Sequence, residues 1–191
     1  CTACIARRPK SDWPYLARGV AFGKLKQFEK AHQDIARSLE LKPESYHAYL
    51  NRGVISVYEK KYDDAQADFE RASQLKPDQA APFINLAATG LERATELFND
   101  SQKPNASVLA AAELQQANVA LTSAIERSPQ QAAIYSFRGR IRMAQNNLTA
   151  ALADFEKANK LEITPLRRAE NFQQIATHQS FFAQHCRGYF S

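Results

Sequence analysis

Apolar and small side chains recur along this chain at steps of three and four residues. One run is Phe28, Ala31, Ile35 and Leu39, and residues 148–158 show the same spacing. Such spacing places the side chains on one face of an α-helix, which completes a turn in about 3.6 residues. No alternation of polar and apolar positions typical of strands competes with it, so the pattern predicts an all-α chain.

The helical pattern itself repeats. Pro9, Pro43 and Pro77 stand 34 residues apart, and each follows an apolar helical stretch. Two further places return in register within the units, the first holding alanine and the second a large apolar residue: Ala31, Ala65, Ala117 and Ala151, then Ile35, Phe69, Leu121 and Phe155. A fixed period of this length predicts a solenoid built from one repeated helix pair.

These places divide the chain into units. We predict the second helix of a truncated repeat over residues 1–11, repeats over 12–45, 46–79, 80–131 and 132–165, and a capping helix over 166–191, all in one solenoid domain. Because the chain begins inside a helix pair, we expect it to be a fragment of a longer protein. We also expect an exposed apolar face at residues 1–8 that favours self-association.

The repeated unit is a helix-turn-helix with an early aromatic residue, a glycine four residues later, small residues in the second helix and a final proline. The early aromatic place holds Tyr15, Tyr49, Phe83 and Tyr135, and the glycine place holds Gly19, Gly53 and Gly139. This pattern resembles the tetratricopeptide repeat, in the style of bacterial arrays, over about nine tenths of the chain. The resemblance implies an all-α, right-handed superhelical solenoid. Ala87 and Ile163 depart from the pattern, at a glycine and a proline place.

Arginine occupies a place where a solenoid helix normally turns an apolar residue inward. In three units an arginine precedes the glycine and an aspartate has a fixed place in the second helix: Arg18 with Asp34, Arg52 with Asp68, and Arg138 with Asp154. The third unit has Leu86 and Ala120 at these places, so both charges are lost together. Since an unpaired inward charge is costly, we predict that each arginine pairs with the aspartate of its own unit.

The third unit is 18 residues longer than its neighbours, and the excess lies between Leu91 and Leu114. Apolar positions continue the helical pattern on both sides of a loop over residues 99–105. We therefore predict two antiparallel helices, each lengthened by about seven residues and projecting about 10 Å. The insertion at 92–113 is either a specific contact site or a tolerated extension, and the sequence favours neither.

The family resemblance also implies a concave groove, lined by the first helices, that binds extended or helical segments of other proteins. Carried over by position, the lining is Leu16, Val20, Leu50, Asn51, Val54, Ile84, Asn85, Ala88, Phe137 and Arg140. The two asparagine amides suit a peptide backbone, although asparagine is common at this place in such repeats whatever they bind. The family members that grip chaperone carboxylates need a lysine and an asparagine where this chain has Leu16 and Val20.

Composition and charge narrow the remaining alternatives. The net charge is +5, from 25 basic and 20 acidic residues. The basic residues are scattered, with the densest cluster at Arg138, Arg140 and Arg142, so RNA binding is disfavoured. No apolar run approaches the roughly 18 residues of a membrane span. Three cysteines form no disulfide framework, and we expect a reducing, cytoplasmic compartment.

The sequence carries no pattern typical of catalysis. It has no glycine-rich phosphate loop, nucleophile elbow or paired-carboxylate site. The Cys1-x-x-Cys4 spacing falls late in a helix rather than at a helix N-terminus, and His178, His185 and Cys186 do not assemble a clear zinc site. We therefore expect no enzyme activity, cofactor, metal or small-molecule substrate.

Together these features predict a scaffold or adaptor that binds a peptide segment of a partner protein in its concave groove. The alternative is a regulatory repeat array of a larger signalling enzyme, such as a bacterial serine/threonine kinase. The sequence does not distinguish the two, because both would use the same groove.

Overall fold

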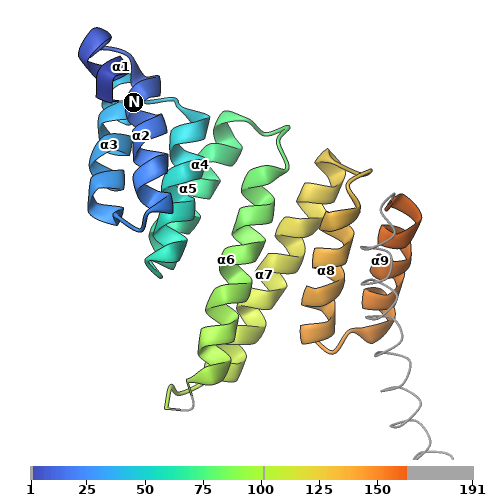
Figure 1. Cartoon of the computed structure of the whole chain (residues 1–191). Coiled ribbons are helices and arrows are strands. Elements are labelled where there is room, and N and C mark those ends of the chain that lie inside the picture. The colour runs from blue at the N-terminus through green and yellow to red at the C-terminus, as the bar shows by residue number, and fades with distance from the viewer. Residues whose placement is uncertain (1, 101, 163–191) are drawn as a thin grey trace, which may run out of the picture. The chain divides into compact units, whose positions relative to one another are not determined.

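Figure 1 shows the computed structural model of the chain, which describes residues 2–100 and 102–162. Within these residues the chain forms nine α-helices and no strand: α1 (Thr2–Arg7), α2 (Asp12–Lys24), α3 (Phe28–Leu41), α4 (Tyr46–Tyr58), α5 (Tyr62–Leu75), α6 (Ala81–Asn99), α7 (Ala106–Arg127), α8 (Ala132–Ala144) and α9 (Leu148–Leu161). The all-α prediction is confirmed. The predicted capping helix over 166–191 and the residues His178, His185 and Cys186 lie outside the described residues.

The chain divides into two compact units, Cys1–Thr89 and Gly90–Ser191, and the division falls inside α6. In the first unit α2 packs against α3 and α4 packs against α5, and in the second α8 packs against both α7 and α9. Helices α2 with α3, α4 with α5, and α8 with α9 are thus helix pairs, which can be followed in Figure 1. The repeat boundaries and the single solenoid domain stay predictions.

Close approach of the paired helices explains the recurring glycines. A Cβ atom at Gly53 would lie 2.7 Å from Cε1 of Phe69, and one at Gly139 would lie 2.9 Å from Cε1 of Phe155. No real side chain tolerates such contacts without movement of the neighbour, so the glycine of the first helix makes room for the large apolar residue of the second. The same arrangement recurs at Gly19 and Ile35, where the distance is 2.8 Å to Cγ1.

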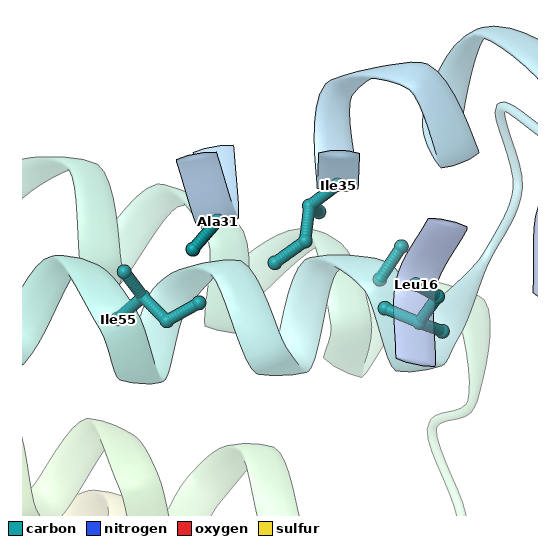
Figure 2. Close-up of a cluster of buried hydrophobic side chains, with 5 residues drawn as sticks. Leu16, Ala31, Ile35 and Ile55 are labelled. Atoms are coloured by element: carbon teal, nitrogen blue, oxygen red, sulfur yellow. The ribbon is translucent and has the colours of Figure 1, made fainter. Parts of the chain in front are cut away.

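The core of the first unit joins successive helix pairs. Figure 2 shows Leu16 of α2, Ala31 and Ile35 of α3, and Ile55 of α4 in one buried cluster. Ala48 of α4 belongs to the same cluster. A helix pair alone cannot bury its apolar face, so contact with the next pair completes this core. Leu16 is only 3% exposed, and its expected place in the groove lining is therefore wrong.

The hairpin turns share one backbone feature. Lys26, Lys60 and Asn146 occupy the same place in three units, and each has a positive φ, of 57°, 62° and 58°. In the first turn Gln27 N donates to Phe22 O and Lys26 N donates to Gly23 O. This bonding satisfies carbonyl groups at the end of α2, as in a Schellman motif.

The helices of the expanded unit are longer than those of its neighbours. Helix α6 has 19 residues and α7 has 22, against 13 in α4 and 14 in α5. In the second unit Nε of Arg93 lies 3.2 Å from Oε1 of Glu113, which ties the two long helices together. Phe98, Val108 and Leu109 are exposed near the turn that joins them.

Candidate peptide-binding groove

A pocket of about 320 Å³ opens in the first unit where α2 and α4 lie next to one another. We call it the α2–α4 pocket. Its lining comes from α2, the following turn, the start of α3, and α4: Val20, Gly23, Lys24, Lys26, Phe28, Asn51, Val54, Ile55 and Tyr58. Two successive helix pairs therefore contribute to one concave site, the arrangement expected of a groove in a helical repeat.

The structure brings three of the expected groove residues together in this pocket, namely Val20, Asn51 and Val54. Leu50 is half-buried on α4 and does not line the pocket.

The other expected residues lie elsewhere. Ile84, Asn85 and Ala88 are half-buried on α6, outside the pocket. Phe137 and Arg140 belong to α8 in the second unit, where the Arg140 guanidinium carbon lies 5.2 Å from the centre of the Phe137 ring. Whether these five residues join the groove stays a prediction.

Asn51 supplies the amide of the pocket. Its Nδ2 donates a hydrogen bond of 2.7 Å to the carbonyl oxygen of His47, one turn earlier on α4. This bond fixes the side chain against its own helix. The oxygen Oδ1 is then the atom with which Asn51 could accept a hydrogen bond from a ligand.

Two lysines give the pocket a positive charge. Lys24 closes α2 and Lys26 lies in the turn after it, and both are exposed. Neither forms an ion pair with any residue that the structure describes. The lining contains no aspartate or glutamate, so the pocket carries no negative charge to offset them.

The carboxylate next to the pocket is already engaged. Glu59 follows Tyr58, and its side chain pairs with His32 of α3 and accepts a 2.9 Å hydrogen bond from Nζ of Lys61. Burial of this carboxyl raises its pKa, but the hydrogen bonds from Lys61 and His32 outweigh burial, so the pKa of Glu59 is lower than usual for glutamate. Glu59 therefore stays charged and bound to its own partners near neutral pH.

Sequence reasoning missed six of the lining residues, including both lysines. The helical step from Val20 leads to Gly23 and Lys24, and the step from Val54 leads to Tyr58, so continuing the stripe into the last turn of each helix would have found these three. Ile55 was missed because it is a core residue that also forms the pocket wall. Lys26 and Phe28 depend on the path of the turn and had no such signal.

The structure also brings together all three predicted arginine–aspartate pairs. Each arginine uses Nε and Nη2 to bind both oxygens of the aspartate sixteen residues later, with N–O distances from 2.6 to 2.9 Å: Arg18 with Asp34, Arg52 with Asp68, and Arg138 with Asp154. The aspartates are buried, so these are two-pronged, charge-assisted contacts across a helix hairpin.

A fourth arginine, Arg142, also binds one of these aspartates, and this contact was not predicted from the sequence. Nη1 of Arg142 lies 2.8 Å from Oδ2 of Asp154, and its Nε donates to Oδ1 of Asn118 at 3.3 Å. Nη1 of Arg138 in turn donates to Oγ1 of Thr122 at 3.2 Å. Asp154 thus serves two guanidinium groups, and α7 contributes acceptors to both.

The described residues contain no cluster of histidine, cysteine, aspartate or glutamate suited to a metal ion. Within the same residues, no helix combines the length and the apolarity needed to cross a bilayer. The chemistry of the α2–α4 pocket suits a ligand that has an apolar group with a negatively charged group next to it.

Comparisons with known proteins agree with the helix pairs. Residues 46–79 match the family model described as a tetratricopeptide repeat. No curated protein sequence matches the chain. Proteins of that family are typically interaction scaffolds and are generally non-catalytic. Residues 46–79 of the chain thus match a tetratricopeptide repeat, which is one helix pair of the described structure.

Solved structures share this fold at low sequence identity. TTC0263, a thermophilic tetratricopeptide repeat protein of Thermus thermophilus, is 18% identical, with a TM-score of 0.65 over 93% of this chain and 89% of that one. MamA of Desulfovibrio magneticus RS-1 is 18% identical, with a TM-score of 0.62 over 82% and 78%. The human IFIT1 dimer with m7Gppp-AAAA is 14% identical, with a TM-score of 0.72 over 96% of this chain but 40% of that one.

Proposed function

We propose that this protein is a non-catalytic interaction scaffold that binds a peptide segment of a partner protein, and that the α2–α4 pocket is the part of its concave groove that receives a ligand side chain. The observation that carries the proposal is the meeting of Val20, Asn51 and Val54, from two successive helix pairs, in one pocket. These residues were expected in the groove from their repeat positions alone.

The chemistry of the pocket suits a peptide. Val20 and Val54 are half-buried and offer apolar surface, while Tyr58 is 70% exposed and can cover a bound side chain. Asn51 offers an amide oxygen for a backbone N–H group. A site that combines apolar walls with a small number of polar groups is the usual form of a recognition pocket.

RNA is the competing class of ligand, and the arginine contacts argue against it. Arg138 and Arg142 of the densest basic cluster are both bound to Asp154. Only Arg140 of that cluster stays exposed, over the ring of Phe137. Because phosphate binding requires available cations, this cluster is a poor phosphate site.

A peptide selection tests the proposal. A library of random linear peptides displayed on phage is selected on the full chain, and an enriched peptide is synthesised with a fluorescent label for anisotropy measurements. We expect Val54→Arg, which puts a long charged side chain into the apolar pocket, and Tyr58→Ala, which removes contact area, each to weaken binding by about tenfold or more. Val119→Arg is the matched control, because Val119 is exposed on α7 in the second unit.

Three results would overturn the proposal. The first is a selection that enriches no peptide. The second is a peptide whose affinity is the same for wild type, Val54→Arg and Tyr58→Ala, when circular dichroism shows that the variants are folded. The third is single-stranded RNA that binds more tightly than the selected peptide at physiological salt and displaces it.

A further inference from the structure

The α2–α4 pocket has an apolar interior and a positively charged rim, which we define as Lys24 and Lys26. No acidic residue in the lining offsets the charge of this rim. We propose that the α2–α4 pocket selects an acidic peptide segment that carries one large apolar side chain, with that side chain in the pocket and the acidic groups on Lys24 and Lys26. This inference rests on the proposed peptide-binding function and goes further by naming the chemistry of the segment.

The interior accepts a side chain rather than a helix. A volume of about 320 Å³ is at the lower end of the range for ligand pockets. Val20, Phe28, Val54 and Ile55 contribute apolar walls. A single aliphatic or aromatic side chain of the partner would exchange contact with water for contact with these walls, which is the main source of affinity in such an anchor.

Gly23 sets the depth of this interior. A Cβ atom at Gly23 would lie 2.9 Å from both Cγ1 and Cδ1 of Ile55, so glycine lets the end of α2 approach the buried Ile55 side chain. Ile55 is 4% exposed and belongs to the core cluster of Figure 2. The wall of the pocket is therefore part of a fixed core.

The rim attracts negative charge. Lys24 and Lys26 are exposed, line the pocket, and have no ion-pair partner in the described part of the chain. Nearby charges do not cancel them, because Glu59 is bound to His32 and Lys61, and Glu29 is exposed on α3 outside the lining. Carboxylates that flank the anchor side chain would complement this field.

These lysines differ in position from those of the chaperone-binding members of the family. In that group the sequence pattern requires a lysine and an asparagine at the places of Leu16 and Val20, early and midway along α2. Here Leu16 is buried, and the lysines follow at the end of α2 and in the turn. The acidic groups of the segment would therefore lie beside the anchor side chain, at the turn between α2 and α3.

Charge reversal at the rim tests the inference with the peptide selected above. The variant is Lys24→Glu with Lys26→Glu. Its matched control is Lys10→Glu with Lys42→Glu, which makes the same change in net charge at two exposed lysines. Lys10 precedes α2 and Lys42 follows α3, so the control lies at the opposite end of the same helix hairpin.

We expect the selected peptides to share a large apolar residue flanked by aspartate or glutamate. We further expect the rim variant to weaken their binding by about tenfold or more, and the control to change it by less than about threefold. Replacing the acidic residues of the peptide by their amides should weaken binding to wild type but strengthen binding to the rim variant, because the two introduced carboxylates of that variant repel the acidic peptide.

The outcomes separate this inference from the proposed function. Peptides that lose binding with Val54→Arg but bind the rim variant and wild type equally overturn the inference and leave peptide binding standing. Equal losses in the rim variant and its control also overturn it, because the effect would then be one of overall charge. Failure to enrich any peptide overturns the proposed function, and the inference with it.

Discussion

The helix pairs α4–α5 and α8–α9 carry the same arginine and aspartate at the same repeat places, yet the two sites differ. In α4–α5 the aspartate Asp68 binds Arg52, whose side chain is 33% exposed. In α8–α9 the aspartate Asp154 binds both Arg138 and Arg142, and the Arg138 side chain is only 13% exposed. The repeat place determines the pair, while neighbouring residues determine its burial and its balance of charge.

The pKa shifts of the arginines show the consequence of this difference. A hydrogen bond to Asp68 raises the pKa of Arg52 above its ordinary value. Burial has the largest effect on Arg142 and lowers its pKa, Asp154 raises it, and the nearby charge of Arg138 lowers it again. The net direction is downward, so Arg142 is less well compensated than Arg52. The α8–α9 site holds one positive charge in excess.

The largest expected effect on stability comes from removing Asp154, the aspartate that binds two arginines. Asp154→Ala leaves two guanidinium groups without their carboxylate, and we expect the second unit to lose about 3–5 kcal/mol of stability. Asp68→Ala leaves one arginine that is more exposed, and we expect a loss of about 1–3 kcal/mol, since water screens its charge. Urea denaturation measures both, and hydrogen exchange along α8–α9 and α4–α5 shows which unit has been destabilised.

Equal losses in the two variants would show that the second arginine and the deeper burial of Arg138 have no energetic consequence. Glu156→Ala is a suitable reference in both experiments, because Glu156 is exposed on α9 and lies outside the aspartate place of any unit.

The sequence was sufficient to predict the three pairs but not the difference between them. The pairs follow from the register of the repeats, supported by Leu86 and Ala120, where both charges are absent. Arg142 lies one helical turn after Arg138, but its hydrogen bond to Asn118 depends on how closely α7 approaches α8, which no periodic pattern encodes.

The groove was predicted in part for the same reason. Repeat positions identified Val20, Asn51 and Val54, because these lie on a regular helical stripe. They failed for Leu16, because the next helix pair covers that side chain, and for Lys26, because it lies in a turn. Helix faces can be read from one sequence, whereas burial by a neighbouring helix pair and the path of a turn require the three-dimensional structure.

A double-mutant cycle tests how much Arg142 contributes to the difference between the two helix pairs. Arg142→Met removes the excess charge and keeps much of the apolar stem, and we expect it alone to change stability by about 1 kcal/mol or less. In this background Asp154→Ala leaves only Arg138 unpaired. We expect its cost to fall by about 1–2 kcal/mol, toward the value for Asp68→Ala, as denaturation of the four proteins of the cycle would measure.

Additive effects of Arg142→Met and Asp154→Ala would contradict this expectation. Residues in direct contact normally show coupling, so additivity would mean that the 2.8 Å contact between Arg142 and Asp154 contributes nothing in solution. The difference between the two helix pairs would then rest on Arg138 and its burial.

The smallest expected effect on stability comes from removing the hydrogen bond between Arg138 and α7. Thr122→Val removes the hydroxyl that accepts the hydrogen bond from Nη1 of Arg138, and it also removes the 2.9 Å bond from that hydroxyl to Asn118 O. Thr95→Val is the matched control, because the Thr95 hydroxyl donates only to Leu91 O, one turn earlier on α6. We expect Thr122→Val to cost about 0.5–1.5 kcal/mol more than Thr95→Val, since one hydrogen bond to a charged group is lost in addition. Equal costs in denaturation would mean that Arg138 gains nothing from α7, and the difference between α8–α9 and α4–α5 would then have to come from Asp154 and Arg142.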